Sequence, residues 1–333
     1  MRYLFYSDMH LRVENIESFV KCHRAIGDIA QKNGVDFLVN CGDMFDKRGV
    51  IKTILLKVLY EERSRWCDDG LVNIDIVGNH DQADRDGEIH PLKVYERFRG
   101  WKVFDKPCLE DYHEMLFLPY VRDTEGVLKS FKKHDQMDCV GHCGVSGATS
   151  NGTEGGLPIK DIEGVHPKFF RRFKNVFLGH YHAHQKIKNI IYIGSPMQHS
   201  FGEVGQTKGV LFYDQATGKK RFIEIGGLPR FHDVEVTFKK GKPVYDLPEV
   251  SPFDKVRAIV RGSSKEVSKI TKSTLGLPCF TKIENKTQSE MVSRLKVDDI
   301  GNEIELIEKY VDFVEHPFKR KELMEVYKEI ANV

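Results

Sequence analysis

Several short segments of this chain carry side chains that bind divalent cations, and each segment follows an apolar run. They are Ser7-Asp8-Met9-His10, Gly42-Asp43-Met44-Phe45-Asp46, Gly78-Asn79-His80-Asp81, Gly141-His142 and Gly179-His180-Tyr181-His182. Carboxylate and amide oxygens and imidazole nitrogens suit divalent cations of intermediate hardness. The residue types therefore predict a metal centre assembled from distant parts of the sequence.

The candidate ligands are more numerous than one ion needs. They are Asp8, His10, Asp43, Asn79, His142, His180 and His182. An Asp can bridge two cations, and two cations about 3.5 to 4 Å apart clamp the attacking and leaving oxygens in phosphoester hydrolysis. We therefore predict a two-metal site that hydrolyses phosphoesters. Cys139 and Cys143 flank His142 and offer a thiolate alternative, which fits poorly beside so many carboxylates.

The elements that position these side chains are predicted from the apolar pattern. Strands are expected at residues 3–6, 37–39, 71–77, 137–140 and 176–178, with the candidate ligands at their carboxyl ends, where ligands bind in α/β sheets. Helical stripes at 15–32 and 50–59 alternate with the first strands, which predicts βαβ units. Further strands at 190–193, 210–213 and 222–225 predict a second, mixed sheet.

The ordered motifs Asp-x-His, Gly-Asp-x-x-Asp, Gly-Asn-His-Asp, Gly-His and Gly-His-x-His resemble the calcineurin-like metallophosphoesterase superfamily, and most of all its SbcD branch of repair and phage recombination nucleases. The resemblance implies an α/β fold with a two-sheet sandwich flanked by helices. It also implies a nuclease domain at 1–228, a small α+β DNA-capping domain at 229–296 and a C-terminal helix-loop-helix at 297–333.

The resemblance also implies a role for each site residue. Asp8, His10 and His182 would hold the first metal, Asn79, His142 and His180 the second, and Asp43 would bridge them, with Mn²⁺ as the expected ion. His80 would protonate the departing sugar oxygen or orient the phosphate. Asp81 would orient His80 or a ligand, and Asp46 stands where many cellular members have a second catalytic His.

Composition sets broad limits on the protein. The 333 residues suggest about two domains, and a formal net charge of +2 means that any DNA-binding surface is a local patch. Seven cysteines without a Cys-x-x-Cys pair predict reduced thiols in a cytoplasmic protein. No apolar run approaches the ~20 residues that span a bilayer, and no signal peptide is expected.

Three regions leave two interpretations open. The Gly, Ser, Thr and Asn-rich stretch 144–156 is either a mobile substrate loop or a solvated surface loop, and His199 is a second-layer or surface histidine. Beyond residue 228, strands at 231–238, 255–260 and 279–286 and a helix at 264–275 carry many lysines, which either contact DNA or form a solvated face. Two amphipathic patterns at 302–333 either pack on their own core or dock on a coiled-coil partner.

The functional hypothesis is a metal-dependent DNA exonuclease and endonuclease. By resemblance it acts with an SbcC-type, SMC-like ATPase in recombination and repair, as a homodimer within the complex. One alternative is a phosphoprotein phosphatase or cyclic-nucleotide phosphodiesterase, which the Ser-Asp-Met-His-Leu motif and the residues beyond the core disfavour. The other is a non-catalytic scaffold, which is disfavoured because clustered acids without a metal would destabilise the fold.

Overall fold

The computed structural model describes residues 1–84, 86–131, 136–154, 157–161, 163–271 and 280–287. The chain divides into two compact units. The first contains Met1–His232 and Glu249–Lys255, and the second contains Asp233–Pro248 and the described residues from Val256 on. Within the described residues, no helix is both long and apolar enough to cross a membrane.

A six-stranded sheet carries the first half of the predicted metal centre. Its strand order is β14 (Lys219–Glu224), β13 (Gly209–Asp214), β1 (Arg2–Tyr6), β2 (Phe37–Asn40), β3 (Val72–Ile76) and β4 (Trp101–Phe104). The strands β1, β2, β3 and β4 run parallel, so their carboxyl ends lie at one edge, whereas β13 pairs antiparallel with β1. The strands predicted at 3–6, 37–39 and 71–77 are present in this sheet. The strands predicted at 210–213 and 222–225 also form, but their assignment to the second sheet was wrong, because β13 pairs with β1 and β14 pairs with β13 in the first sheet.

A second six-stranded sheet carries the other half. Its order is β11 (Gln185–Ile187), β12 (Ile190–Tyr192), β10 (Val176–Gly179), β7 (Asp138–His142), β6 (Met115–Leu118) and β5 (Cys108–Glu110). The central strands β6, β7, β10 and β12 are parallel, and both edge strands are antiparallel. The predicted α/β fold with two sheets and flanking helices is therefore confirmed.

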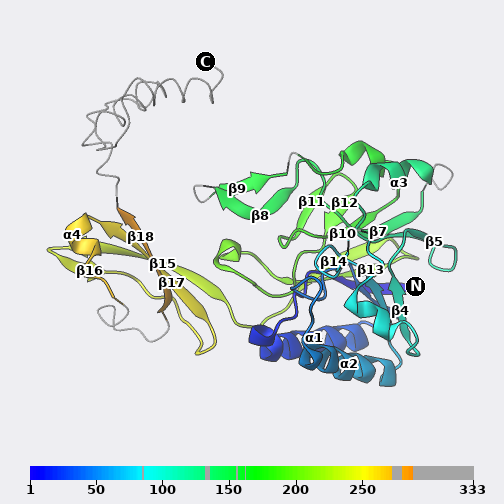
Figure 1. The fold of residues 1–333 in the computed structure, drawn as a ribbon, viewed down its shortest axis with the longest axis horizontal. Helices are drawn as coiled ribbons and strands as arrows, with labels where there is room; N and C mark the ends of the chain where they lie inside the picture. Colours follow the sequence, from blue (N-terminus) through cyan, green and yellow to red (C-terminus); the bar gives the residue numbers. More distant parts are fainter. Residues whose placement is uncertain (85, 132–135, 155–156, 162, 272–279, 288–333) are drawn as a thin grey trace, which may run out of the picture. The chain divides into compact units, whose positions relative to one another are not determined.

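Helices flank the two sheets (Figure 1). The helices α1 (Ile16–Lys32) and α2 (Thr53–Asp68) lie together against the first sheet, and α3 (Thr124–Ser130) lies on the far side of the second. Short 3-10 turns are η1 (Val13–Asn15), η2 (Pro91–Tyr95), η3 (Pro167–Phe170) and η4 (Phe201–Glu203). The prediction of a helix at 50–59 was too short at its C-terminal end, since α2 spans Thr53–Asp68. The helix continues to Asp68 because two polar residues of its second half, Glu62 and Arg63, are buried through ion pairs; Arg63 Nη2 lies 2.8 Å from Asp75 Oδ1.

Successive side chains of β1 point to opposite faces of the first sheet and therefore belong to different layers of the core. Leu4 and Tyr6 pack in the cluster that includes α1 and α2, whereas Tyr3 and Phe5 face the second sheet. Between the sheets, the rings of Phe5 and Phe177 stack with centroids 4.5 Å apart. A third cluster covers the outer face of the second sheet. The two sheets are thus fixed face to face by close aromatic packing.

The stretch predicted as a loop at 144–156 is partly a strand. The strand β8 (Thr149–Glu154) pairs antiparallel with β9 (Leu157–Lys160). Thr149 N donates to Gln185 Oε1 at 2.7 Å, and Gln185 Nε2 donates to Thr149 O at 2.8 Å. The composition of this stretch did not indicate this backbone pairing.

The second unit is built on a four-stranded sheet of order β16 (Lys242–Val244), β15 (Phe231–Lys239), β17 (Lys255–Gly262) and β18 (Phe280–Thr287). The strands predicted at 231–238, 255–260 and 279–286 correspond to β15, β17 and β18. The helix predicted at 264–275 is wrong in length, because α4 (Ser264–Val267) ends where a turn follows, and residues 272–275 lie outside the described residues. The predicted helix-loop-helix at 297–333 also lies outside them.

Candidate metal centre

The backbone bends sharply at the carboxyl ends of β1, β2 and β10. Asp8, Asp43 and His180 have φ of 55°, 55° and 104°. This region costs residues other than glycine about 1–3 kcal/mol each and is concentrated at functional sites. Asp8 N donates to Gly42 O at 2.9 Å, and His10 N donates to Asp43 O at 3.0 Å. These bonds hold the first two strand ends together and turn their side chains toward one point.

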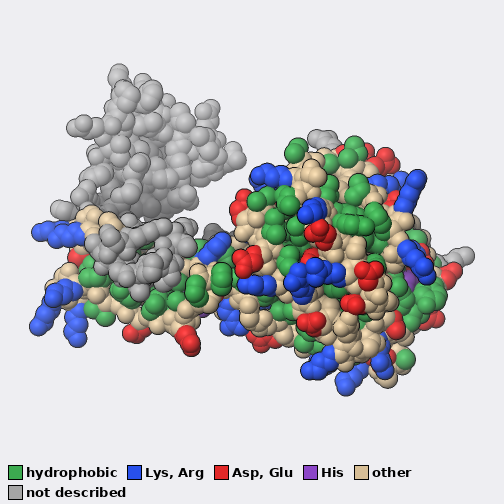
Figure 2. Space-filling model, turned by 90° about the horizontal axis from the view of Figure 1, so that it is seen from below, with side chains coloured by type: hydrophobic (Ala, Val, Ile, Leu, Met, Phe, Trp, Pro, Cys, Tyr) green, Lys and Arg blue, Asp and Glu red, His purple; other side chains and the backbone are tan. Residues whose placement is uncertain are grey.

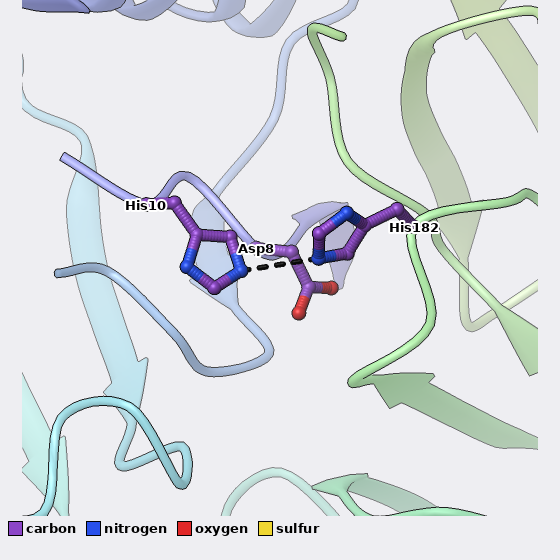
Figure 3. Close-up of side chains that lie close together, drawn as sticks. All are labelled: Asp8, His10 and His182. Atoms are coloured by element: carbon purple, nitrogen blue, oxygen red, sulfur yellow. Dashed lines mark hydrogen bonds between the residues drawn. The ribbon is translucent and has the colours of Figure 1, made fainter. Parts of the chain in front are cut away.

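Asp8, His10 and His182 form the first group of donors (Figure 3). Each offers a ligand atom within 4.8 Å of the others. The two Nε2 atoms of His10 and His182 are 3.1 Å apart, and the Asp8 carboxylate accepts from His180 N at 3.1 and 3.2 Å. Residues from opposite sheets therefore converge here, as the sequence predicted.

Asp43 lies between the donor groups. Its Oδ2 is 3.9 Å from His10 Nε2 and 3.3 Å from His142 Nε2, and its Oδ1 accepts from His80 N at 2.8 Å. Burial alone would raise the pKa of Asp43, but His142 and His10 outweigh it and hold that pKa well below its usual range. Asp43 is thus an ionised carboxylate placed to touch both groups.

Asn79, His142 and His180 form the second group. Asn79 Oδ1 lies 2.9 Å from His142 Nε2 and 3.0 Å from His180 Nδ1. Burial lowers the pKa of His142, but the Asp43 and Asp8 carboxylates overcome that effect and raise the pKa to about 9. For His180, burial and the neighbouring His142 lower the pKa to about 4.

The hydrogen bonds of two histidines show that these donors fit cations. His142 Nδ1 lies 2.8 Å from the Cys41 carbonyl, which can only accept, so Nδ1 carries the proton and neutral His142 turns an Nε2 lone pair toward oxygen atoms. His182 Nδ1 lies 2.8 Å from a Glu203 carboxylate oxygen, which likewise leaves a lone pair on Nε2. Lone pairs that face other acceptors need a proton or a metal cation between them. The mixed oxygen and imidazole donors suit a divalent metal.

Glycines in the motifs make this convergence possible. A Cβ at Gly78 would overlap the Asp43 carboxylate, and a Cβ at Gly42 would overlap the His142 ring. Gly42 also has φ +106°, which other residues rarely adopt. The Gly-Asp and Gly-Asn-His-Asp motifs therefore need glycine for close approach of the strand ends.

Comparison with known proteins agrees with this geometry. The sequence model of the family described as calcineurin-like phosphoesterase matches residues 1–184, which is more than half of the 333 residues. The chain belongs to the calcineurin-like phosphoesterase family. This family uses divalent metal ions, and the donor groups around Asp43 are this chain's candidate ligands.

Similar proteins within this family carry nuclease and repair names. The chain is 24% identical to exonuclease subunit 1 of Enterobacteria phage T4 over 326 residues, which cover 94% of this chain and 93% of the relative. It is 40% identical to a subunit of the nuclease SbcCD from Staphylococcus epidermidis over 77 residues, 22% of this chain and 21% of that protein. It is 23% identical to the DNA double-strand break repair protein Mre11 of Methanopyrus kandleri over 296 residues, 78% and 62% of the two chains.

His80 and Asp46 are partly buried and lie beside His10. His80 Nδ1 is 2.8 Å from the Asp46 carbonyl, and the His80 ring meets the edge of the His10 ring with centroids 4.8 Å apart. The Asp46 carboxylate accepts from Arg12 at 3.2 Å and lies 3.6 Å from His10 Nδ1. His80 Nδ1 therefore carries a proton toward Asp46 O, and Nε2 is left for another partner.

The Asp81 carboxylate accepts hydrogen bonds from backbone N–H groups and forms none with the His80 ring among the described residues. Its carboxylate accepts from Gly78 N at 2.9 Å, Phe45 N at 3.0 Å and Met44 N at 3.4 Å. Burial and the nearby Asp43 raise the pKa of Asp81 to about 7. Asp81 thus ties the loop after β3 to the loop that carries Asp43.

Two residues that the sequence did not single out lie directly behind His182. Besides its bond to His182 Nδ1, Glu203 pairs through Oε2 with Lys208 Nζ at 2.7 Å, and the two side chains are 3% and 7% exposed. Lys208 Nζ also donates to His182 O at 2.9 Å and Ser195 Oγ at 2.8 Å. No motif marks this ion pair, which lies shortly after Gly194-Ser195-Pro196 in the sequence.

His199 also supports the site from behind. Its Nε2 lies 2.8 Å from the Asp8 carbonyl, and its backbone N donates to Glu203 Oε2 at 3.1 Å. Its ring centroid is 5.2 Å from those of both His10 and His182. His199 therefore links the Glu203 carboxylate to the backbone of Asp8.

Two other groups lie apart from this centre. Cys139 and Cys143 pack in the outer core cluster of the second sheet, and neither belongs to a metal-type group in the part of the chain that the structure describes. A separate group contains His90, Glu96 and Asp105. Lys93 Nζ already bonds Asp105 at 2.9 Å and Glu96 at 2.6 Å, so a lysine balances these carboxylates.

Proposed function

We propose that this chain is a two-metal-dependent DNA nuclease, acting as exonuclease and endonuclease. The main support for this proposal is that candidate ligands from opposite sheets converge around the ionised Asp43 carboxylate. Family membership supports a metal-dependent phosphoesterase. The match to a phage exonuclease subunit over 94% of this chain supports DNA as the substrate.

In this proposal Asp8, His10 and His182 hold one ion, and Asn79, His142 and His180 hold the other. Asp43 would contact both ions, because its Oδ2 lies 3.9 Å from His10 Nε2 of one group and 3.3 Å from His142 Nε2 of the other. Mn²⁺ is the proposed ion, since the donor set mixes oxygen atoms with imidazole nitrogens. When bound, the ions supply a hydroxide near neutral pH and neutralise charge on the phosphate oxygens.

The remaining residues orient the substrate and move the proton. His80 donates a hydrogen bond from Nδ1 to the Asp46 carbonyl, so it would act as the doubly protonated imidazolium and pass the Nε2 proton to the departing sugar oxygen. Asp46 and Arg12 pair beside it and keep the loop after β2 in place. Asp81 holds the Asp43 loop through backbone bonds, so the distance between Asp43 and His80 is set by the fold.

We also propose roles for the second unit and for the C-terminal residues. Residues 229–296 form a DNA-capping domain, supported by exposed lysines at 239, 240, 242, 265 and 269 in the second unit. Residues 297–333 dock on the coiled coil of an SbcC-type ATPase, and the protein acts in the cytoplasm in DNA recombination and repair. Two of the relatives are named as subunits, which supports an assembly of several chains.

A homodimer is proposed from the apolar surface around α2. Tyr60, Val94 and Phe98 are 43%, 58% and 43% exposed, and the rings of Tyr60 and Phe98 are 5.2 Å apart. Figure 2, seen from the side on which α1 and α2 lie, shows hydrophobic surface among charged side chains. Tyr60 lies on α2 and Val94 on η2, and exposed apolar side chains of this kind favour burial against a second copy.

One assay tests the nuclease proposal. End-labelled duplex and single-stranded DNA, a small aryl phosphodiester and a phosphoserine peptide are incubated with Mn²⁺, Mg²⁺ or a chelator. We expect cleavage of DNA and of the diester with Mn²⁺, none with chelator, and loss of both reactions in Asp43→Ala. Faster hydrolysis of the phosphopeptide than of DNA would favour a phosphatase, and DNA binding without hydrolysis in any metal would favour a scaffold.

A further inference from the structure

A cavity of about 490 Å³ opens beside the metal centre, next to Asn79. Besides Asn79, its lining includes Arg48, Gln82, Asp84, Tyr120 and Arg122. The volume lies within the ~300–1,000 Å³ of ordinary ligand pockets. Because Asn79 lines the cavity and also belongs to the donor groups, a molecule in the cavity would lie next to the metal centre.

Two arginines give the cavity its charge. Arg48 and Arg122 are exposed, and within the described residues neither guanidinium forms an ion pair or a hydrogen bond. Asp84 is the acidic residue in the lining, so the formal charge is two arginines less one carboxylate, or +1. One Asp84 oxygen already accepts from Ile89 N at 3.3 Å. Unpaired guanidiniums with planar donor sets are suited to phosphate oxygens.

Tyr120 supplies a fixed aromatic platform. Its ring lies nearly parallel to the His180 ring, with an interplanar angle of 22° and centroids 6.4 Å apart. Its backbone N donates to Val77 O at 2.9 Å, and its carbonyl accepts from Gln82 Nε2 at 2.7 Å. Gln82 is itself buried. The strand end that presents Asn79 therefore also fixes the position of Tyr120.

We propose that this cavity binds one nucleotide of the substrate strand next to the scissile phosphate. Its base stacks on Tyr120, and a flanking phosphate pairs with Arg48 and Arg122. The proposal rests on the proposed nuclease function and extends it, because it assigns recognition of the nucleoside to groups outside the metal ligands. Stacking accepts every base, so the site selects for nucleic acid without selecting a sequence.

Two substrates with the same leaving group test the proposal. One is the p-nitrophenyl ester of thymidine 5′-phosphate, and the other is methyl p-nitrophenyl phosphate, in which a methyl group replaces the nucleoside. We expect Tyr120→Leu to lower the ratio of kcat/KM for the first to that for the second by about 10-fold, as for loss of one base–aromatic stack. The ratio cancels any change common to both reactions, such as altered metal content. An unchanged ratio would overturn the stacking assignment.

Matched variants separate the ring from the charges. Tyr120→Phe keeps the ring and should keep the ratio, whereas Tyr112→Leu removes an exposed tyrosine elsewhere. Arg48→Ala combined with Arg122→Ala should weaken the nucleotide ester, and Arg99→Ala, an exposed arginine outside the cavity lining, should not. Both arginines are exposed, so their removal leaves the core intact. Equal effects of the cavity and control variants would refute a nucleotide site.

A binding measurement distinguishes failure here from failure of the nuclease proposal. Thymidine 5′-phosphate and inorganic phosphate are titrated into the full chain by calorimetry. We expect Tyr120→Leu to weaken the nucleotide about 10-fold and inorganic phosphate little, and the arginine pair to weaken both. If the wild type hydrolyses neither ester, the nuclease proposal fails, while this titration still decides whether the cavity binds a nucleotide. Equal weakening of both ligands by Tyr120→Leu would contradict the stacking role.

Discussion

Replacement of Glu203 tests whether the ion pair behind His182 sets metal affinity. Glu203 Oε1 bonds His182 Nδ1 at 2.8 Å, which is a charge-assisted hydrogen bond. Such bonds contribute about 1.5–3 kcal/mol, and neutral ones about 0.5–1.5 kcal/mol. Glu203→Gln keeps a hydrogen-bond acceptor for His182 but removes its charge, so the bond should weaken by about 1–1.5 kcal/mol. If that energy is lost from Mn²⁺ binding, the affinity falls about 10-fold. Glu203→Ala removes the bond, and the loss should approach 100-fold.

The same substitution also affects stability, and the two effects can be separated. Glu203 and Lys208 are almost fully buried, and breaking a buried ion pair costs about 3–5 kcal/mol because one charge is left unpaired. Glu203→Gln and Lys208→Met should each lower the free energy of unfolding. The double variant removes both charges and should regain most of that stability. Metal affinity should stay low in the double variant, since His182 still lacks a carboxylate partner.

Calorimetric titration of Mn²⁺ into the metal-free protein measures affinity, and urea denaturation measures the free energy of unfolding. Glu62→Gln is the matched control, because Glu62 is also buried and pairs with Arg24 at 3.1 Å, but on α2. This control should lower stability and leave Mn²⁺ binding unchanged. If the double variant regains both stability and affinity, Glu203 acts only through folding, and the proposed role in orienting His182 is refuted.

Three further predictions follow from the geometry. His80→Ala should lower kcat about 10²- to 10⁴-fold, while metal analysis should still find two ions per chain. Loss of an ion would instead make His80 a ligand. The Mn²⁺ affinity should rise about 10-fold per pH unit from pH 6 and level off near pH 9, because a proton with a pKa of about 9 must leave His142 before the metal binds. An affinity that does not change between pH 6 and 10 would show that His142 carries no such proton in the metal-free protein. Gly27→Ala should destabilise the protein by about 1–3 kcal/mol in urea, because the added Cβ would lie 2.5 Å from Trp66 Nε1; unchanged stability would show that Trp66 moves freely.

The main parts of the site could be predicted because their signals are local. An apolar run followed by Gly-Asp or Gly-His contains both the strand and its ligand within a few residues. Parallel pairing then brings the ends of β1, β2 and β3 together, and the same holds for β7 and β10. Sequence periodicity and motif order were sufficient for this level of the fold.

The missed features depend on contacts between distant residues. Glu203 and Lys208 look like surface charges in the sequence, and only their distance of 2.7 Å behind His182 shows their role. The second half of α2 was missed because Arg63 is buried through Asp75 on β3, a partner that helical periodicity cannot show. The strand β8 was missed because it pairs with β9 through the backbone, and the Gly, Ser, Thr and Asn-rich sequence gives no apolar strand signal.

Packing between the sheets sets the geometry of the metal centre. Asp8 and Asp43 follow strands of the first sheet, whereas His142 ends β7 and His180 and His182 follow β10 in the second. The distance between these halves is fixed where Phe104 stacks on Phe117 at 4.1 Å and Phe5 stacks on Phe177 at 4.5 Å. Because such a core cannot be compressed without cost, the carboxylates of one sheet stay within reach of the imidazoles of the other before any cation binds. The aromatic layer is therefore as much a part of the site as the ligands.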